Sequence, residues 1–288
     1  MFGVSAALTT PFNDDDSVDF ARLNNHIKTV LFDGCTSVTF FGTTGEGASV
    51  ANNMRLETIR MAINAGIDPD KFILALHGAA ADDIVLQAKA ALQMGVQRFL
   101  LPPPCYFHDP TDQGLFGWFN SILSQFSGTP AEFILYHIPQ VIGVGLPIDL
   151  IGQLKAAHPN AVYGVKDSSG SFENTVELLQ LSDLKILVGD ERLLAEAVKR
   201  GASGAISGIA NLFSGRLSQV IATGKNDPAI NRLVDTVLQF PVTPAIKALV
   251  AHKYADNQWR RTTPPLIAIS DTDYQILANA YDSADVSK

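Results

Sequence analysis

The sequence has only two cysteines, Cys35 and Cys105, and they lie far apart in the chain. They are not spaced as C-x-x-C, so they offer neither a disulfide framework nor a cysteine-based metal site. Unpaired cysteines of this kind are typical of proteins from reducing compartments. We therefore expect a cytoplasmic protein without disulfides.

Basic residues are also fewer than acidic ones. The sequence has 21 Lys and Arg and 29 Asp and Glu, which gives a formal net charge of -8. Nucleic acids and anionic membranes bind basic surfaces, so this balance argues against both as partners. No apolar run approaches the roughly 20 residues of a membrane-spanning helix. None of the six histidines falls in an HxH or HExxH pattern, and we expect no metal site. Small metabolites are the partners that this composition favours.

The chain does have a regular alternation of short apolar runs and amphipathic stretches. Runs rich in Val, Ile, Leu and Phe are each followed by a loop and then by apolar residues at three- and four-residue spacing, which is typical of βα units. Eight such units close a TIM, or (β/α)8, barrel, and we predict this α/β fold over residues 1–224. The predicted strands are Val4–Leu8, Thr36–Phe41, Phe72–Leu76, Arg98–Leu101, Phe133–His137, Val162–Lys166, Ile186–Val188 and Gly204–Ser207.

After residue 224 the strand pattern stops. Residues 225–288 are predicted to be helical, around Ile230–Gln239, Pro244–Tyr254 and Asp273–Tyr281. No flexible linker precedes this extension, so we expect it to pack on the barrel within the same domain. The alternative, a doubly wound sheet, usually has a Gly-rich nucleotide-binding turn after its first strand. Here that strand ends in Thr9-Thr10-Pro11-Phe12, which favours the barrel.

In a βα barrel the active site lies at the C-terminal ends of the strands, and one lysine stands at such an end. Lys166 follows the run Val162–Val165, so it is a candidate amine nucleophile that forms an imine with a ketone. The plain alternative is a lysine whose head group reaches solvent. Tyr136, at the end of the preceding strand, is a candidate proton shuttle or an ordinary rim aromatic.

A glycine-rich loop, Gly42–Gly47 (GTTGEG), follows the second predicted strand. Its backbone N–H groups and hydroxyls can form a cradle for an anion, or its glycines simply allow a tight turn. It lacks the Gly-Lys-Ser/Thr ending of a Walker loop, so a carboxylate suits it better than a triphosphate. Tyr106 and Phe107, after the fourth predicted strand, are expected at the barrel mouth or at an interface.

Four segments together resemble the dihydrodipicolinate synthase and N-acetylneuraminate lyase superfamily. They are Gly42–Glu46, Tyr136–Pro139, Gly164–Asp167 and Gly201–Asn211, and the likeness covers nearly the whole chain. Several motifs in the right order are more specific than any one of them. The resemblance implies a pyruvate-dependent class I aldolase on a TIM barrel, with a covalent imine at the lysine and no cofactor. It also implies a homotetramer built as a dimer of dimers.

The resemblance assigns roles residue by residue. Lys166 matches the Schiff-base lysine, and Tyr136 matches the tyrosine that protonates and deprotonates the reacting hydroxyl. Thr43 and Thr44 match the pair that holds the carboxylate of the keto acid, and Thr43 also relays protons. Substrate contacts are expected from Thr44, Gly45, Ser168, Gly189, Ile206, Ser207 and Tyr106.

Two positions depart from the synthase pattern. Val141 stands where the synthases have an arginine that grips the carboxylate of the aldehyde, and Phe107 replaces an aromatic hydroxyl donated across the dimer interface. We therefore expect an aldolase that forms or cleaves a 4-hydroxy-2-oxo acid, with pyruvate as enamine partner and an aldehyde as second substrate. Three alternatives stay open: 4-hydroxy-tetrahydrodipicolinate synthase, a 2-keto-3-deoxy sugar-acid dehydratase, and a non-catalytic protein that binds keto acids.

Overall fold

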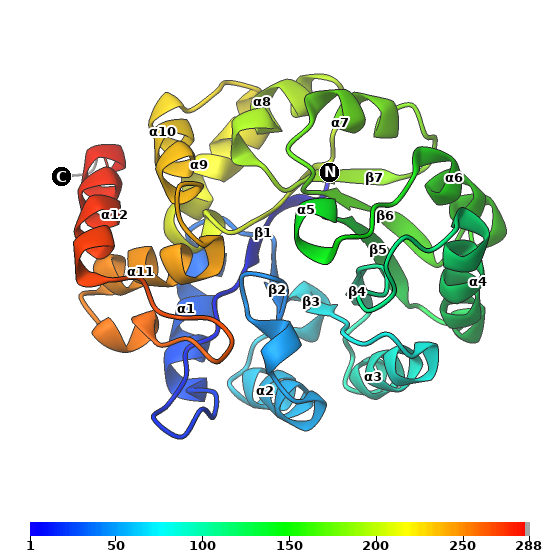
Figure 1. The fold of residues 1–288 in the computed structure, drawn as a ribbon, viewed down its shortest axis with the longest axis horizontal. Coiled ribbons are helices and arrows are strands. Elements are labelled where there is room, and N and C mark those ends of the chain that lie inside the picture. The colour runs from blue at the N-terminus through cyan, green and yellow to red at the C-terminus, as the bar shows by residue number, and fades with distance from the viewer. Residues whose placement is uncertain (286–288) are drawn as a thin grey trace.

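The computed structural model describes residues 1–285, and in them eight parallel strands close into a barrel in which β8 pairs with β1. Figure 1 looks onto this barrel, with helices arranged around the strands. The predicted (β/α)8 barrel is therefore confirmed. Its strands are β1 (Gly3–Ala7), β2 (Ser37–Phe40), β3 (Phe72–Ala75), β4 (Arg98–Leu101), β5 (Glu132–His137), β6 (Val162–Asp167), β7 (Lys185–Val188) and β8 (Gly204–Ser207).

The strands lie where the apolar runs predict them, with small differences at their ends. β2 ends at Phe40 because Phe41 has a positive φ of 57°, which an extended strand does not allow. β1 begins at Gly3, which pairs with Gly204 of β8 at the seam of the barrel. These shifts leave the order and number of strands as predicted.

The helices follow the strands as the βα pattern requires. Six of the described helices begin with a side-chain cap of the expected type; in α1 and α7, for example, Asp19 and Ser171 accept hydrogen bonds from backbone N–H groups of the first turn. The helices are α1 (Phe20–Phe32), α2 (Asn52–Asn64), α3 (Ala81–Gln93), α4 (Asp112–Leu123), α5 (Pro139–Ile142), α6 (Ile148–Ala157), α7 (Phe172–Leu178), α8 (Glu191–Lys199), α9 (Ala210–Thr223), α10 (Pro228–Val237), α11 (Val242–Tyr254) and α12 (Asp271–Ala284). Short 3₁₀ helices are η1 (Gly47–Ser49), η2 (Pro69–Lys71), η3 (Ser124–Phe126) and η4 (Asn257–Arg260).

Strand side chains alternate between two cores, as the two-residue period of a strand requires. One set points into the barrel and forms a small interior cluster that includes Ile73, Leu100, Ile134, Tyr136, Leu187 and Ile206. The other set points outward and joins the helices in a much larger cluster. The interior is thus filled by side chains, and a functional site has to lie at one of its ends.

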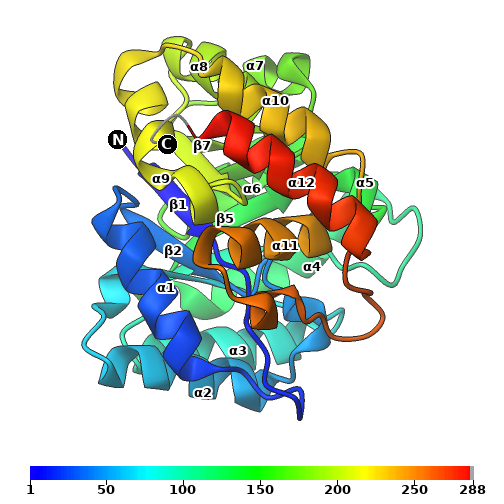
Figure 2. The same ribbon diagram turned by 90° about the vertical axis from the view of Figure 1, so that its left-hand side faces the viewer.

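The C-terminal helices α10, α11 and α12 lie beside α1, α8 and α9 on one side of the barrel (Figures 1 and 2). α10 packs against α8 and α12, and α11 packs against α9, α12 and η4. α11 is buried from Thr243 to Ala251, including Lys247. The predicted tail helices are thus present, and they pack against α8 and α9, two of the helices that surround the barrel. Residues 286–288 of the predicted extension lie outside the described part.

Candidate active site

The register of β5 and β6 brings the predicted nucleophile and the predicted proton shuttle together. Tyr136 pairs with Lys166 across these two parallel strands. Lys166 Nζ donates a hydrogen bond to the Tyr136 hydroxyl at 3.1 Å and lies 4.2 Å from the centre of its ring. Lys166 is only 5% exposed. The alternative of a lysine that reaches solvent is therefore wrong.

The groups around Tyr136 favour ionisation of its hydroxyl. Burial raises the pKa of Tyr136, but the charge on Lys166 and the hydrogen bonds with Thr43, Lys166 and Ser168 outweigh burial and lower the pKa below its usual value. The Thr43 hydroxyl lies 3.4 Å from the Tyr136 oxygen. A phenol with a lowered pKa can accept a proton and return it within one catalytic cycle.

The loop after β2 presents Thr43 and Thr44 at the same end of the barrel. It begins at Phe41, where the positive φ turns the chain out of the strand. The backbone N–H groups of residues 45–47 bond to carbonyls within the loop. By contrast, three donors in the loop bond to no group among residues 1–285: the backbone N–H groups of Thr43 and Thr44 and the Thr44 hydroxyl. These free donors form a cradle that can bind a carboxylate.

Glu46 ties this loop to the C-terminal part of the chain. Its buried side chain forms an ion pair with Lys247 of α11, and its second oxygen accepts bonds from the backbone N–H and hydroxyl of Thr263 at 2.8 and 3.0 Å. Burial lowers the pKa of Lys247 to about 8, although the Glu46 carboxylate opposes this shift. The Thr243 hydroxyl also donates to the Thr43 carbonyl at 3.0 Å. These contacts, here called the brace, hold the cradle in place.

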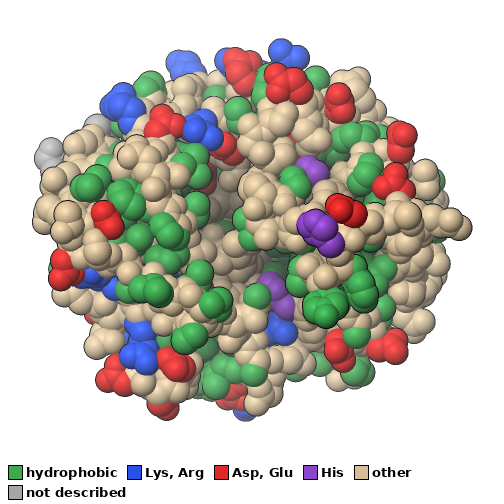
Figure 3. All heavy atoms as spheres, in the orientation of Figure 1, with side chains coloured by type: hydrophobic (Ala, Val, Ile, Leu, Met, Phe, Trp, Pro, Cys, Tyr) green, Lys and Arg blue, Asp and Glu red, His purple; other side chains and the backbone are tan. Residues whose placement is uncertain are grey.

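Two cavities of about 350 Å³ each meet at Thr43 and Tyr136. We name the first the lysine chamber, because it contains Lys166; on the tail side it is closed by Val234, Val237, Leu238, Val242 and Ile246. The second, the apolar chamber, lies toward β3 and β4 and is lined by Ala75, His77, Pro102, Pro103, Ile142 and Leu266, among others. Figure 3 shows a hollow at the centre of this face, with hydrophobic side chains gathered beside it over α10 and α11.

Thr44, Ser168, Gly189 and Ile206, four of the residues predicted to contact substrate, line the lysine chamber. A side chain is excluded at Gly189, because a Cβ there would lie 2.0 Å from Ser168 Oγ. Thr43 lines both chambers. The structure therefore gathers most of the predicted site around the Lys166 amine.

Gly45, Ser207 and Tyr106 were also predicted to contact substrate, but they line neither chamber. A Cβ on Gly45 would lie 2.8 Å from a backbone carbonyl oxygen, so this glycine serves the tight turn. Ser207 faces away from the interior because its neighbour Ile206 faces inward, and its hydroxyl donates to Glu191. Tyr106 is 83% exposed on the loop after β4.

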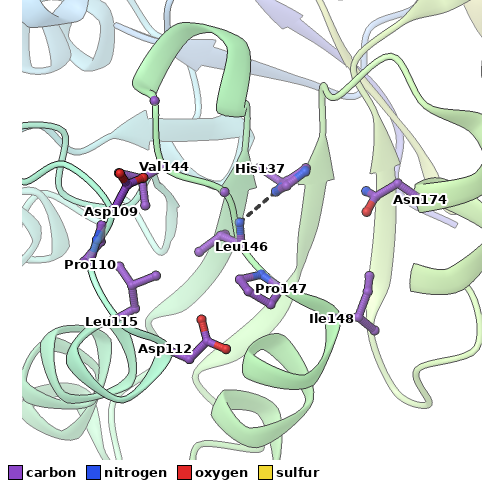
Figure 4. Close-up of a pocket in the computed structure, with 12 residues that line it drawn as sticks. Asp109, Pro110, Asp112, Leu115, His137, Val144, Leu146, Pro147, Ile148 and Asn174 are labelled. Carbon is purple, nitrogen blue, oxygen red and sulfur yellow. Dashed lines mark hydrogen bonds between the residues drawn. The ribbon is translucent and has the colours of Figure 1, made fainter.

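A third cavity, of about 400 Å³, lies beside β5 and contains His137 (Figure 4). This histidine follows Tyr136 in the strand and so points to the opposite face. Its Nδ1 accepts a hydrogen bond from the Leu146 N–H at 2.9 Å. Burial lowers the pKa of His137, although Asp167 opposes the shift. None of the residues that line this cavity lines either chamber, so the cavity is separate from the candidate site.

The side chains around the chambers favour amine and hydroxyl chemistry. Within residues 1–285, no three His, Cys, Asp or Glu side chains are grouped so that they could hold a metal ion. His77 is instead a neutral donor to the Phe41 carbonyl at 2.6 Å, and burial lowers its pKa to about 4. None of the helices in the described part of the chain is long and apolar enough to cross a membrane.

Sequence reasoning missed the brace. Part of the signal was present, since Lys247 is the only charged residue in the apolar run Pro244–Ala251, and a buried charge needs a partner. The identity of that partner was not visible, because Glu46 lies 201 residues away. Thr263, in a loop without a recognisable motif, left no signal of its own.

Comparisons with known proteins agree with this geometry. The model of the Dihydrodipicolinate synthetase family matches residues 1–281. The crystal structure of dihydrodipicolinate synthase from Agrobacterium tumefaciens superimposes with a TM-score of 0.96 at 44% sequence identity, over 99% of this chain and 100% of that one.

Two curated relatives extend the comparison. An uncharacterized DapA-like lyase of Chloroflexus aurantiacus is 30% identical over 97% of this chain and 96% of its own. A 4-hydroxy-tetrahydrodipicolinate synthase of Methanococcoides burtonii is 28% identical over 96% of each chain. The resemblance predicted from the four sequence segments is confirmed. The chain belongs to the dihydrodipicolinate synthetase family and is an enzyme of the carbon–carbon lyase class.

Proposed function

We propose that the chain is a Schiff-base aldolase that forms or cleaves a 4-hydroxy-2-oxo acid, with pyruvate as the enamine partner. The observation that carries the proposal is the buried Lys166 amine, 3.1 Å from the Tyr136 hydroxyl, in a chamber that Thr43 and Thr44 also line. An amine nucleophile, a proton shuttle and an anion cradle are the three parts that imine chemistry on a keto acid requires. The proposed steps use no metal and no organic cofactor.

In the synthetic direction the keto acid binds first, with its carboxylate on the free donors of Thr43 and Thr44. The neutral Lys166 amine attacks the ketone carbon, and Tyr136 and Thr43 carry protons to the ketone oxygen, which leaves as water. The resulting iminium withdraws electrons from the neighbouring methyl group. That group loses a proton and becomes the enamine carbon.

The enamine carbon then attacks the aldehyde carbon, and Tyr136 protonates the aldehyde oxygen, which becomes the 4-hydroxyl. Water hydrolyses the new iminium, which frees Lys166 and releases the product. Cleavage is the reverse sequence, in which Tyr136 removes the proton from the 4-hydroxyl. The lowered pKa of Tyr136 supports both directions, because the phenol then gives up and regains its proton more easily.

Borohydride trapping tests the proposal. With pyruvate present, reduction of the imine should leave a stable secondary amine on Lys166, which peptide mass spectrometry locates. Lys247 is the matched internal control: it is also buried, but it lines neither chamber and should stay unmodified. The absence of an adduct on Lys166 would overturn the proposed function.

A second candidate is 4-hydroxy-tetrahydrodipicolinate synthase, the activity named for the M. burtonii relative. It would use the same imine with a different aldehyde. Complementation of a lysine auxotroph that lacks this synthase separates the two candidates. Growth would support the synthase, whereas an adduct at Lys166 without growth would support an aldolase for another aldehyde.

We also propose that the chain is a cytoplasmic homotetramer, as the family resemblance implies. The loop after β4 supports an interface, because Tyr106 and Phe107 are 83% and 58% exposed and contact each other edge to face. Exposed aromatic side chains are typical of surfaces that a partner covers. Light scattering should give a mass of four times 30.9 kDa. A monomer mass would contradict this assembly.

A further inference from the structure

We infer that the second substrate is an uncharged aldehyde with an apolar chain, rather than an aldehyde that carries a carboxylate. The inference rests on the proposed function, because it concerns the partner of the enamine. It follows from the charges and the surfaces of the lysine chamber and the apolar chamber.

The basic side chains that line the chambers are few. Among residues 1–285 these are Lys166 and Arg192. Arg192 is already neutralised, because it donates to both oxygens of Asp190 at 3.0 and 2.6 Å and to Asp235 at 2.9 Å. Lys166 is used by the imine, whose positive charge is balanced by the carboxylate of the keto acid. A second carboxylate therefore finds no free cation in either chamber.

The other titratable groups do not favour an anion either. Asp190 and Glu191 line the lysine chamber, and Glu46 lines the apolar chamber. Glu191 is 8% exposed and already accepts bonds from Ser207 and from the backbone N–H of Ile209. Asp190 and Glu46 are balanced by Arg192 and Lys247, whereas Glu191 has no basic partner within residues 1–285 and disfavours a further negative charge nearby. An acceptor without a charge avoids this cost.

The aldehyde is positioned by Tyr136. Its oxygen has to lie next to the Tyr136 hydroxyl, which supplies and removes its proton. Tyr136 lines both chambers, and so does Val141, which is 58% exposed. Whichever chamber the rest of the aldehyde enters, Val141 therefore forms part of its wall.

The surfaces beyond Val141 are largely hydrocarbon. In the lysine chamber they are Val234, Val237, Leu238, Val242 and Ile246 of the C-terminal part. In the apolar chamber they are Ala75, Pro102, Pro103, Ile142 and Leu266. An apolar chain is stabilised when it leaves water for such a surface, and the few polar groups fix the reacting end.

Two aldehydes of equal length test the inference. Butanal and 4-oxobutanoate differ in that a carboxylate replaces the methyl group at the far end. With butanal, the methyl carbon of pyruvate bonds to the aldehyde carbon and gives 4-hydroxy-2-oxoheptanoate. We expect the wild-type kcat/KM for butanal to exceed that for 4-oxobutanoate by about tenfold or more, because the carboxylate would be left unpaired.

Val141→Arg should weaken or abolish this preference by giving the carboxylate a partner, with kcat/KM for 4-oxobutanoate raised by about tenfold. Val141→Leu is the matched control, because it adds bulk without charge and should keep the preference for butanal. Three outcomes would each overturn the inference. They are no turnover of butanal by the wild type, a wild-type preference for 4-oxobutanoate, and a ratio of the two kcat/KM values that is unchanged in Val141→Arg.

Trapping with pyruvate and borohydride separates this inference from the proposed function. Val141→Arg should form the Lys166 adduct as the wild type does, because Val141 lies on the aldehyde side. No adduct in the wild type overturns the proposed function. If the wild type forms the adduct but prefers 4-oxobutanoate, the inferred substrate class is overturned and the proposed function stands. The same holds if the adduct forms in the wild type and is lost in Val141→Arg.

Discussion

Lys166 in β6 and Lys247 in α11 are both buried, at 5% and 0% exposure, but their surroundings differ. Lys247 forms an ion pair with Glu46, which is bonded in turn to Thr263. Lys166 bonds to the Tyr136 hydroxyl, and no carboxylate of the described chain lies within ion-pair distance of its Nζ. The Lys247 amine is thus held by a carboxylate, whereas the Lys166 amine lines a chamber that a substrate can enter, so we expect the two lysines to have different roles.

Under the proposed function, the same side chain serves stability at Lys247 and chemistry at Lys166. A carboxylate next to Lys166 would favour the protonated amine, which is not a nucleophile. A carboxylate next to Lys247 has no such drawback, because that lysine only holds α11 against the cradle loop. The paired lysine therefore orders the site, and the unpaired one is available to the substrate.

The largest effect should come from removing the amine of Lys166 while keeping its charge. In Lys166→Arg we expect kcat/KM to fall by about 10⁴-fold or more, because a guanidinium cannot form the imine. The assay is pyruvate release from a 4-hydroxy-2-oxo acid that the wild type cleaves. Activity near the wild-type level in Lys166→Arg would mean that a positive charge at this position is sufficient for catalysis. It would contradict the different roles assigned to Lys166 and Lys247.

The second test removes the polar partner of Lys166. Tyr136→Phe should lower kcat by about 10² to 10⁴-fold, the usual contribution of proton transfer, and should still form the borohydride adduct with pyruvate. Tyr163→Phe is the control: Tyr163 lies in β6, the strand of Lys166, but it lines neither chamber. An unchanged kcat in Tyr136→Phe would assign proton transfer to another group.

The third test breaks the buried ion pair. Lys247→Met should lower the free energy of unfolding by about 3 to 5 kcal/mol, because it leaves Glu46 as an uncompensated buried charge. Glu46→Gln combined with Lys247→Met should cost less than Lys247→Met alone, which urea unfolding can measure. Lys199→Met is the control, since Lys199 pairs with Glu196 on the surface and should contribute no more than about 1 kcal/mol. A double variant as unstable as the sum of the single variants would show that the pair is not coupled.

The smallest effect is expected at the outer end of the brace. Thr263→Val removes the hydroxyl bond to Glu46 and keeps the backbone bond, so we expect a loss of about 1 kcal/mol in the free energy of unfolding. Thr223→Val, at an exposed hydroxyl whose bonds to the Gln219 carbonyl and the Lys225 N–H can be replaced by water, should change it by less than about 0.5 kcal/mol. Equal effects of the two substitutions would mean that Thr263 does not support the brace through its side chain.

Predictions from the sequence succeeded where the signal is local and failed where orientation matters. Lys166 and Tyr136 end neighbouring strands of a parallel barrel, so their proximity followed from the strand order. Ser207 was predicted to contact substrate but lines neither chamber; every residue of β8 is buried, and the apolar pattern does not reveal which ones face inward. Gly45 was expected to bind substrate, whereas in the structure a side chain at this position would clash with the carbonyl oxygen of Leu8, which is distant in the sequence.

The sequence by itself determined the eight βα units, the helical tail and the ends of the strands that form the mouth. It could do so because hydrophobic periodicity and turn residues act over a few positions. Only the tertiary structure decided that Glu46 meets Lys247, that Arg192 is neutralised by two aspartates, and that the chambers beside Lys166 have apolar walls. These features depend on how segments far apart in the chain pack together, and no local pattern records that packing.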